Sequence, residues 1–305
     1  MGIKYYPLAP AQATQHQLAK EFGTSQVLNI CVCSTLKANI NFGLLKQCIQ
    51  EEFKRSECLR IRLTEPDENG DVMQYIAPHD SRDIELVDLS GLSEDEVNKK
   101  LEQWSFKAFS KPHAPLVDIK MIKLPDGYQG LYISIDHRLA DSSAMIVIIN
   151  DIMELYCHYV FKSPYPQPLP LYTEALEKDL EKEKKQKKIE RDEAFWDEVL
   201  SIGEPLYSDV TGPWKLEDDR KKHNNPDQRY VYRNIEDTRV GFASFSLEPE
   251  PSFRLLEYCL NNNVSMTNLL LMGLRTYLSK VNNGQTDISI RNFVSRRSTK
   301  LERFS

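Results

Sequence analysis

The 305-residue sequence lacks a continuous apolar run of about 18 residues, the usual sign of a membrane-spanning helix. We therefore expect no membrane segment. The N-terminal segment MGIKYYPLAPAQ also lacks the basic, apolar and small-residue order of a signal peptide, so we expect a cytoplasmic protein. In a reducing compartment the six cysteines should be free thiols, and core packing is their expected role.

The patterns typical of metal sites and activated nucleophiles are missing too. Cys31 and Cys33 lie two apart in a strand-like run, but no second pair at zinc-ligand spacing accompanies them. The histidines other than His137 form no cluster with carboxylates, and no glycine-rich elbow surrounds a serine. We expect no bound metal or cofactor and no serine or cysteine nucleophile.

Positive charge is in deficit. The formal net charge is −6, which argues against a general nucleic-acid surface. The tail from Arg291 to Ser305 is locally basic. Such a pattern fits a surface that faces an anion, a solvated face, or an artefact of where the chain stops.

Strand-like and helix-like segments alternate in the first half of the chain, which indicates an α/β protein with a mixed sheet. Residues 143–160 are expected to form a helix capped by Asp141, Ser142 or Ser143. A second helix is expected at 42–53. The expected strands are residues 26–36, 72–77, 84–88, 116–124 and 131–135, the last buried on both faces.

Prolines recur at positions 164, 166, 168 and 170, which predicts a connector between two lobes. We place the lobes at residues 1–171 and 172–305. A solvated helix over Tyr172–Leu200 is expected next, anchored at its end by Phe195, Trp196 and Val199. The remaining predictions are a loop at 215–233, a strand at 240–247 and helices at 252–261 and 267–281, the last capped by Ser265.

His137 and Asp141 form the motif that best suits catalysis, with Asp136 before the histidine and Ser142 after the aspartate. An unperturbed imidazole, with a pKa of about 6.5, can accept a proton from an amine or hydroxyl near neutral pH. A nearby aspartate can orient that imidazole or brace the loop. The same spacing also fits a structural histidine beside an N-capping aspartate, so it leaves both readings open.

Several segments, in order, resemble the condensation domains of nonribosomal peptide synthetases. The segment Tyr6–Gln12 (YPLAPAQ) resembles that family's opening motif, and Arg55–Arg60 (RSECLR) resembles its Arg-His-Glu-x-Leu-Arg motif. Asp136–Ser142 (DHRLADS) resembles its His-His-x-x-x-Asp-Gly motif. Residues 264–268 and 284–297 resemble the helix and the Asp-Val-x-x-Gly-x-x-x-x-x-Arg run of its second lobe.

The resemblance implies the two-lobe fold of chloramphenicol acetyltransferase, with a tunnel between the lobes. It implies an acyltransferase in which an acceptor amine or alcohol attacks an acyl thioester held on phosphopantetheine, as an acyl or peptidyl carrier protein or as acyl-CoA. His137 would deprotonate or position the acceptor. Asp141 would be structural, with Arg297 as its salt-bridge partner, and Arg60 would be a further structural arginine.

The motif departs from the family pattern at two positions. Asp136 replaces the first histidine, and its carboxylate would favour the imidazolium form of His137. Ser142 replaces the glycine and adds a Cβ. Because complete domains of this family extend beyond the Val-Ser-Arg-Arg segment, we expect a truncated second lobe.

Two alternative functions remain open. One is a free-standing alcohol or sugar O-acyltransferase that uses acyl-CoA. The other is a catalytically degenerate condensation-like module that docks a partner.

Overall fold

The computed structural model describes residues 2–78, 82–184, 186–201, 203, 206–232, 243–292, 297 and 299–304. The chain divides into two compact units, Met1–Lys185 with Ser295–Ser305, and Gln186–Val294. Helix α5 (Tyr172–Glu183) falls in the first unit. These units are groups of residues in mutual contact, whereas the boundary expected after Leu171 separates two lobes of a fold. That boundary stays a prediction.

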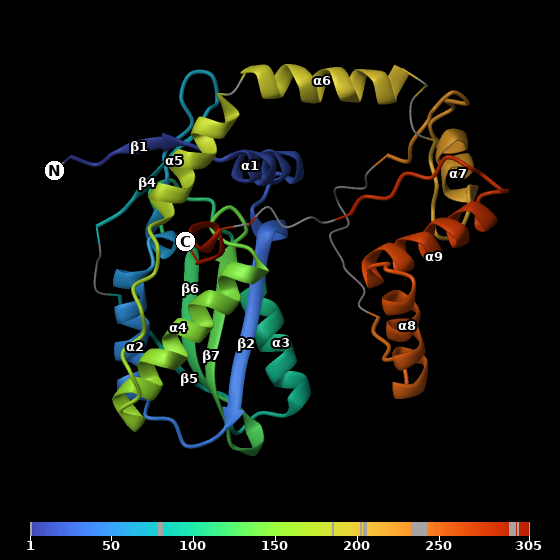
Figure 1. The fold of residues 1–305 in the computed structure, drawn as a ribbon. Helices are drawn as coiled ribbons and strands as arrows, with labels where there is room; N and C mark the ends of the chain where they lie inside the picture. Colours follow the sequence, from blue (N-terminus) through green and yellow to red (C-terminus); the bar gives the residue numbers. More distant parts are fainter. Residues whose placement is uncertain are drawn as a thin grey trace. The chain divides into compact units, whose positions relative to one another are not determined.

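A mixed sheet of four strands forms the centre of the first unit (Figure 1). Its order is β2 (Asn29–Lys37), β7 (Tyr128–Asp136), β6 (Val117–Lys123) and β5 (Leu86–Asp88). The β5–β6 pair is parallel and the other two pairs are antiparallel. The α/β class with a mixed sheet is confirmed. The expected strand at 26–36 begins later, at Asn29, because residues 26–28 form a 3₁₀ turn.

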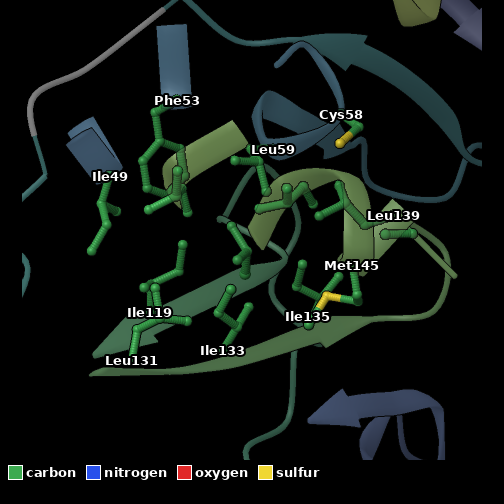
Figure 2. Packing of buried hydrophobic residues seen from close by; sticks show 14 of the residues in the cluster. Ile49, Phe53, Cys58, Leu59, Ile119, Leu131, Ile133, Ile135, Leu139 and Met145 are labelled. Atoms are coloured by element: carbon green, nitrogen blue, oxygen red, sulfur yellow. The ribbon is translucent and has the colours of Figure 1, made fainter. Parts of the chain in front are cut away.

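Helices α2 (Phe42–Arg55) and α4 (Ser142–Phe161) pack on one face of this sheet. Figure 2 shows Phe53 of α2 and Met145 of α4 in one cluster with Ile133 of β7. Helix α3 (Glu94–Ser105) covers the other face, where the ring centroids of Trp104 and Tyr132 lie 5.2 Å apart. Residues 131–135 of β7 are therefore buried on both faces, as predicted.

A second sheet of three antiparallel strands completes the first unit. Its order is β1 (Tyr5–Pro7), β4 (Met73–Ile76) and β3 (Ile61–Leu63). Helix α1 (Pro10–Phe22) follows β1, and the short helix α10 (Lys300–Phe304) contacts α4 and α5.

Helix α4 is the element that comes nearest to a membrane-spanning segment within the described residues. It has 20 residues and a mean hydropathy of 1.4, so it is long and apolar enough to cross a membrane by length and composition. Met145, Ile148 and Ile152 are fully buried in the core against α2 and the sheet. Packing in the core of the fold is thus sufficient to explain the apolar run.

The second unit, where the structure describes it, is helical. Its helices are α6 (Gln186–Ser201), α7 (Trp214–Lys222), α8 (Pro249–Asn261) and α9 (Met266–Val281). The expected helices at 252–261 and 267–281 are confirmed as α8 and α9. The predicted cap of α9 is confirmed as well, since Ser265 Oγ accepts a hydrogen bond from the Asn268 amide at 3.1 Å.

Several predictions for the second half were wrong. The single helix over Tyr172–Leu200 is two helices, α5 and α6, and its expected anchors Phe195, Trp196 and Val199 are exposed. The expected loop at 215–233 contains most of α7, whose Asp218 and Lys222 form an i,i+4 ion pair at 2.7 Å. Of the expected strand at 240–247, residues 240–242 lie outside the described residues and 243–247 form no strand.

Candidate functional site

The loop between β7 and α4 carries the predicted catalytic histidine. The His137 amide donates to the Leu28 carbonyl at 2.9 Å, and the Leu139 amide donates to the Asp136 carbonyl at 2.8 Å. These bonds fold residues 136–140 into a tight turn against the start of β2. Within this turn His137 is half-buried, whereas the other four residues are buried.

The imidazole of His137 is oriented by the turn itself. Its Nδ1 lies 3.0 Å from the Ala140 carbonyl oxygen. Because a carbonyl oxygen only accepts hydrogen bonds, Nδ1 carries a hydrogen, and in the neutral ring the lone pair then lies on Nε2. Within the described residues Nε2 makes no hydrogen bond. The geometry therefore presents Nε2 as a proton acceptor.

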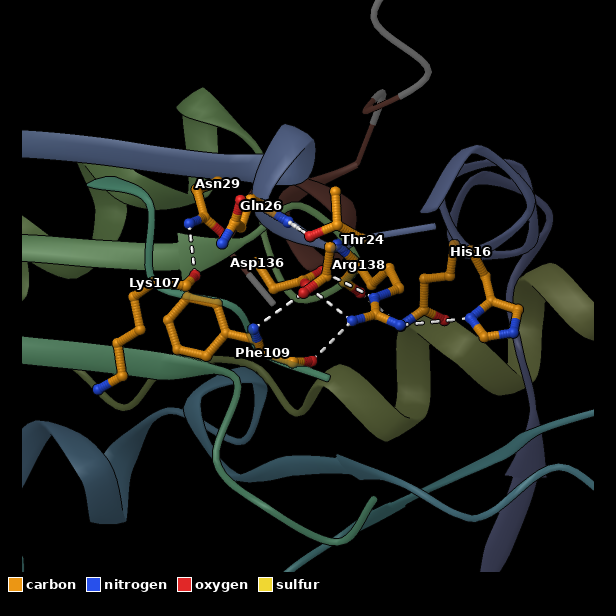
Figure 3. A network of polar contacts seen from close by, with 10 residues as sticks. His16, Thr24, Gln26, Asn29, Lys107, Phe109, Asp136 and Arg138 are labelled. Carbon is orange, nitrogen blue, oxygen red and sulfur yellow. Dashed lines mark hydrogen bonds and ion pairs between the residues drawn. The ribbon is translucent and has the colours of Figure 1, made fainter. Parts of the chain in front are cut away.

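Asp136 has a different partner from the one expected. Arg138 donates to Asp136 Oδ1 through Nε at 2.8 Å and to Oδ2 through Nη2 at 2.7 Å (Figure 3). The Arg138 amide also donates to Oδ1, at 2.9 Å. This bidentate pair compensates the charge of the buried carboxylate through three hydrogen bonds from Arg138.

Helix α1 and Phe109 extend the contacts of Arg138. Its Nη2 donates to the Phe109 carbonyl at 3.0 Å, and its Nη1 lies 3.3 Å from His16 Nδ1. Burial, followed by the positive charge of Arg138, lowers the pKa of His16, which keeps this imidazole neutral and able to accept. Gln12, from the opening motif, donates to the Arg138 carbonyl at 2.8 Å.

Asp141 closes the other end of the loop. Its Oδ1 caps α4 by accepting from the Ala144 amide at 2.9 Å, so the predicted capping role is confirmed. Arg297 Nη2 donates to the same oxygen, also at 2.9 Å. The structure thus brings together Asp141 and Arg297, although Arg297 falls in the first compact unit with Ser295–Ser305.

Ser142 and Arg60 lie in ordinary structural settings. Ser142 is the first residue of α4, its side chain is exposed and its φ is not positive, so its Cβ causes no strain there. Arg60 belongs to the region of the smaller sheet, where its Nη1 donates to the Ala77 carbonyl at 3.0 Å. Within the described residues, no hydrogen bond or ion pair joins Arg60 to the His137 loop.

Sequence reasoning missed Arg138 and its neighbours Gln12 and His16. An available signal was the opposite charge two residues after Asp136 in a polar loop. Within the described part of the chain, no three or more His, Cys, Asp or Glu side chains gather in a way that suits a metal ion.

The model of the condensation domain family matches residues 3–305. Surfactin synthase subunit 1 of Bacillus subtilis (strain 168) is 24% identical over 315 residues, which cover 99% of this chain and 8% of that protein. Bacitracin synthase 1 of Bacillus licheniformis is 23% identical over 295 residues, 94% of this chain and 5% of that protein. The chain therefore spans a small part of these relatives.

Solved structures agree on the fold. The first condensation domain of the calcium-dependent antibiotic synthetase, in complex with a substrate analogue, gives a TM-score of 0.77 at 17% identity, over 99% of this chain and 67% of that chain. The starter condensation domain of the rhizomide synthetase RzmA gives 0.56 at 15% identity, over 68% of this chain and 54% of that chain. Both likenesses support the chloramphenicol-acetyltransferase-like fold. With its family model matched over residues 3–305, this chain belongs to the condensation domain family, a family of acyltransferases.

Proposed function

We propose that this chain forms an amide bond by acyl transfer, with the Nε2 atom of His137 as the general base. One observation carries the proposal, the hydrogen bond between His137 Nδ1 and the Ala140 carbonyl. That bond assigns the ring hydrogen to Nδ1 and leaves the Nε2 lone pair on a half-buried side chain. Family membership supports the reaction class.

In the proposed step an acceptor amine attacks the carbonyl carbon of an acyl thioester. The carbon–nitrogen bond forms, His137 Nε2 takes a proton from the amine, and the carbon–sulfur bond breaks. The phosphopantetheine thiolate leaves with the bonding electrons and is protonated. Phosphopantetheine is thus part of the donor substrate, carried by a carrier protein or by coenzyme A.

The arginine and aspartate residues of the site take supporting roles in this proposal. Asp141 fixes the start of α4 and, through Arg297, ties the loop to the segment at residue 297. Arg60 joins the turn before β3 to the end of β4 and serves structure alone. We place the reaction in the cytoplasm, as the sequence suggests.

Octanoyl coenzyme A and Leu-SNAC are suitable probes, because a double mutant of the starter condensation domain of rhizomide synthetase is solved in complex with C8-CoA and Leu-SNAC. The full chain is incubated with both compounds, and the octanoyl-leucyl product is measured by mass spectrometry. We expect product from the native chain and a rate lower by roughly 10²–10⁴-fold from His137→Ala. An unchanged rate in His137→Ala would reject His137 as the base.

The acceptor atom is tested in the same way. Replacing the amine probe with the corresponding hydroxy-acid thioester asks whether an ester forms instead. Amide formation with little ester supports the proposal, whereas ester formation alone favours the O-acyltransferase alternative. A chain that transfers octanoate to neither acceptor under these conditions would contradict amide synthesis with this donor and support the docking alternative.

A further inference from the structure

Arg138 and Asp136 form an ion pair inside the turn that carries His137. Their side chains are 7% and 0% exposed. Burying two charges costs free energy that only good geometry and further hydrogen bonds offset. Here both carboxylate oxygens accept from the guanidinium, and Asp136 Oδ1 also accepts from the Arg138 amide. The pair is therefore well satisfied within three consecutive residues.

Contacts from outside the loop converge on the same arginine. The Phe109 carbonyl accepts from Nη2, His16 Nδ1 faces Nη1, and Gln12 donates to the arginine carbonyl. Figure 3 shows the guanidinium between Asp136 and His16. Arg138 thus joins the loop to α1 and to the segment at Phe109.

The imidazole of His137 is held by fewer hydrogen bonds than the guanidinium of Arg138. Among the described contacts of the His137 side chain, the one hydrogen bond is that of Nδ1 to Ala140. The length of this bond depends on where the backbone of the turn places the Ala140 carbonyl. Any shift of the turn that lengthens it would release the ring and allow the other tautomer.

We propose that Arg138 is a positioning residue for His137, which fixes the turn at residues 136–140 so that the Ala140 carbonyl holds Nδ1–H and leaves Nε2 free. The catalytic consequence rests on the proposed function of His137. The effect on the tautomer does not, because it is a property of the ring and the turn alone.

A second buried pair in the same unit supplies a matched control. Arg55 of α2 donates to Asp151 of α4 through Nε at 2.6 Å and Nη2 at 2.8 Å. The Arg55 and Asp151 side chains are 10% and 6% exposed. The two pairs are alike in chemistry and burial, but within the described residues no hydrogen bond or ion pair joins Arg55 or Asp151 to the turn at residues 136–140.

The first readout is the tautomer of His137. The chain is labelled with [¹⁵N]histidine, and the ring nitrogen shifts are measured above the titration range, with His137→Gln to assign the signal. We expect the Nδ1–H form to dominate in the native chain and a mixture in Arg138→Met. Arg138→Lys keeps the charge without the bidentate fork, so an intermediate result is expected. Arg55→Met should retain the native tautomer.

The second readout separates positioning from stability. Asp136→Asn/Arg138→Met removes both charges, so it should recover much of the unfolding free energy that Arg138→Met loses. If the pair positions His137, this double variant still shows mixed tautomers and a kcat lower by about 100-fold, with KM nearly unchanged.

Either of two results would overturn the inference. One is the native His137 tautomer in Arg138→Met. If Arg138→Met fails to fold, the native tautomer in Arg138→Lys overturns the inference instead. The other is a native tautomer in the stable double variant. If the tautomer shifts but His137→Ala keeps full activity, positioning stands and the proposed function fails.

Discussion

The two ends of the His137 loop are each fixed by an aspartate and an arginine, but in opposite ways. At the β7 end, Asp136 and Arg138 are two residues apart and almost fully buried. At the α4 end, Asp141 and Arg297 are 156 residues apart, with side chains 33% and 26% exposed. The first pair is built into the loop. The second depends on where a distant segment of the chain lies.

The difference in burial determines how much each ion pair contributes to the free energy of unfolding. Removing one partner of a buried pair leaves an uncompensated charge without water, which is strongly destabilising. A partly exposed pair is screened by solvent and contributes little by itself. We therefore expect the β7 end to control both the stability and the geometry of the loop, and the α4 end to act chiefly through the cap of α4.

The largest effect is expected from breaking the buried end. Arg138→Ala leaves the Asp136 carboxylate buried without its partner, and the first unit should lose about 3–5 kcal/mol of unfolding free energy. Urea denaturation followed by far-ultraviolet circular dichroism measures this loss. A loss below about 1 kcal/mol would show that water or a rearranged side chain replaces the guanidinium, and that the two ends do not differ as described.

A buried carboxyl without its own arginine sharpens the comparison. Glu52 of α2 is fully buried, and burial, followed by its contact with Asp151, raises the pKa of Glu52 well above 4.5. The folded state therefore holds this proton more tightly than the unfolded state, and Glu52 stabilises the fold less as pH rises above about 4.5. We expect Glu52→Gln to gain stability relative to the native chain between pH 5 and pH 8, as followed by urea titrations at several pH values.

Lowering the pH restores the proton to Glu52, so the two chains should converge in stability near pH 4.5 or below. A difference between the chains that does not change with pH would contradict a protonated Glu52.

A smaller effect is expected at the exposed end. Asp141→Ala removes the cap of α4 and the contact with Arg297, at a cost of about 1–2 kcal/mol. Asp141→Asn keeps a good capping oxygen and should cost about half of that or less. Thermal unfolding of both variants tests this order. Equal losses in the two variants would mean that the charge, rather than the cap, is the important feature of Asp141.

The smallest effect is expected from Arg297→Met. It keeps the cap of α4 and removes a partly exposed ion pair, so it should cost about 1 kcal/mol or less and depend on salt. The measurement is the urea midpoint at 0.05 M and 0.5 M sodium chloride. A loss as large as that of Arg138→Ala would remove the distinction between the two ends.

The sequence predicted the core elements around the site well. Helix α4 combines a long apolar run with Asp141 before it, and these two signals define its start. Helices α1 and α3 were missed. Helix α1 buries a single side chain, Gln12, whereas α3 has apolar residues at helical spacing and a Ser93–Glu96 capping box that sequence reasoning did not use. Helix α7 was read as a loop because polar residues dominate it.

The site was predicted in part, and by different kinds of reasoning. The spacing of His137 and Asp141 left a catalytic and a structural reading open, and the family resemblance favoured the catalytic one, which stays a prediction. The partner Arg297 also came from the resemblance, since no local pattern links residues 156 apart. Arg138 was missed because arginine is ordinarily exposed, and only the fold brings His16 and Phe109 to it.

The most direct test of the account compares two histidines. His158 of α4 also lies beside a carbonyl, with Nδ1 2.6 Å from the Ser163 oxygen, but it is remote in sequence from the His137 loop. Single-turnover rates of amide formation from octanoyl coenzyme A and Leu-SNAC are measured for His137→Ala and His158→Ala. The account predicts a rate at least about 100-fold lower for His137→Ala and a nearly native rate for His158→Ala. Equal rates in the two variants would contradict it.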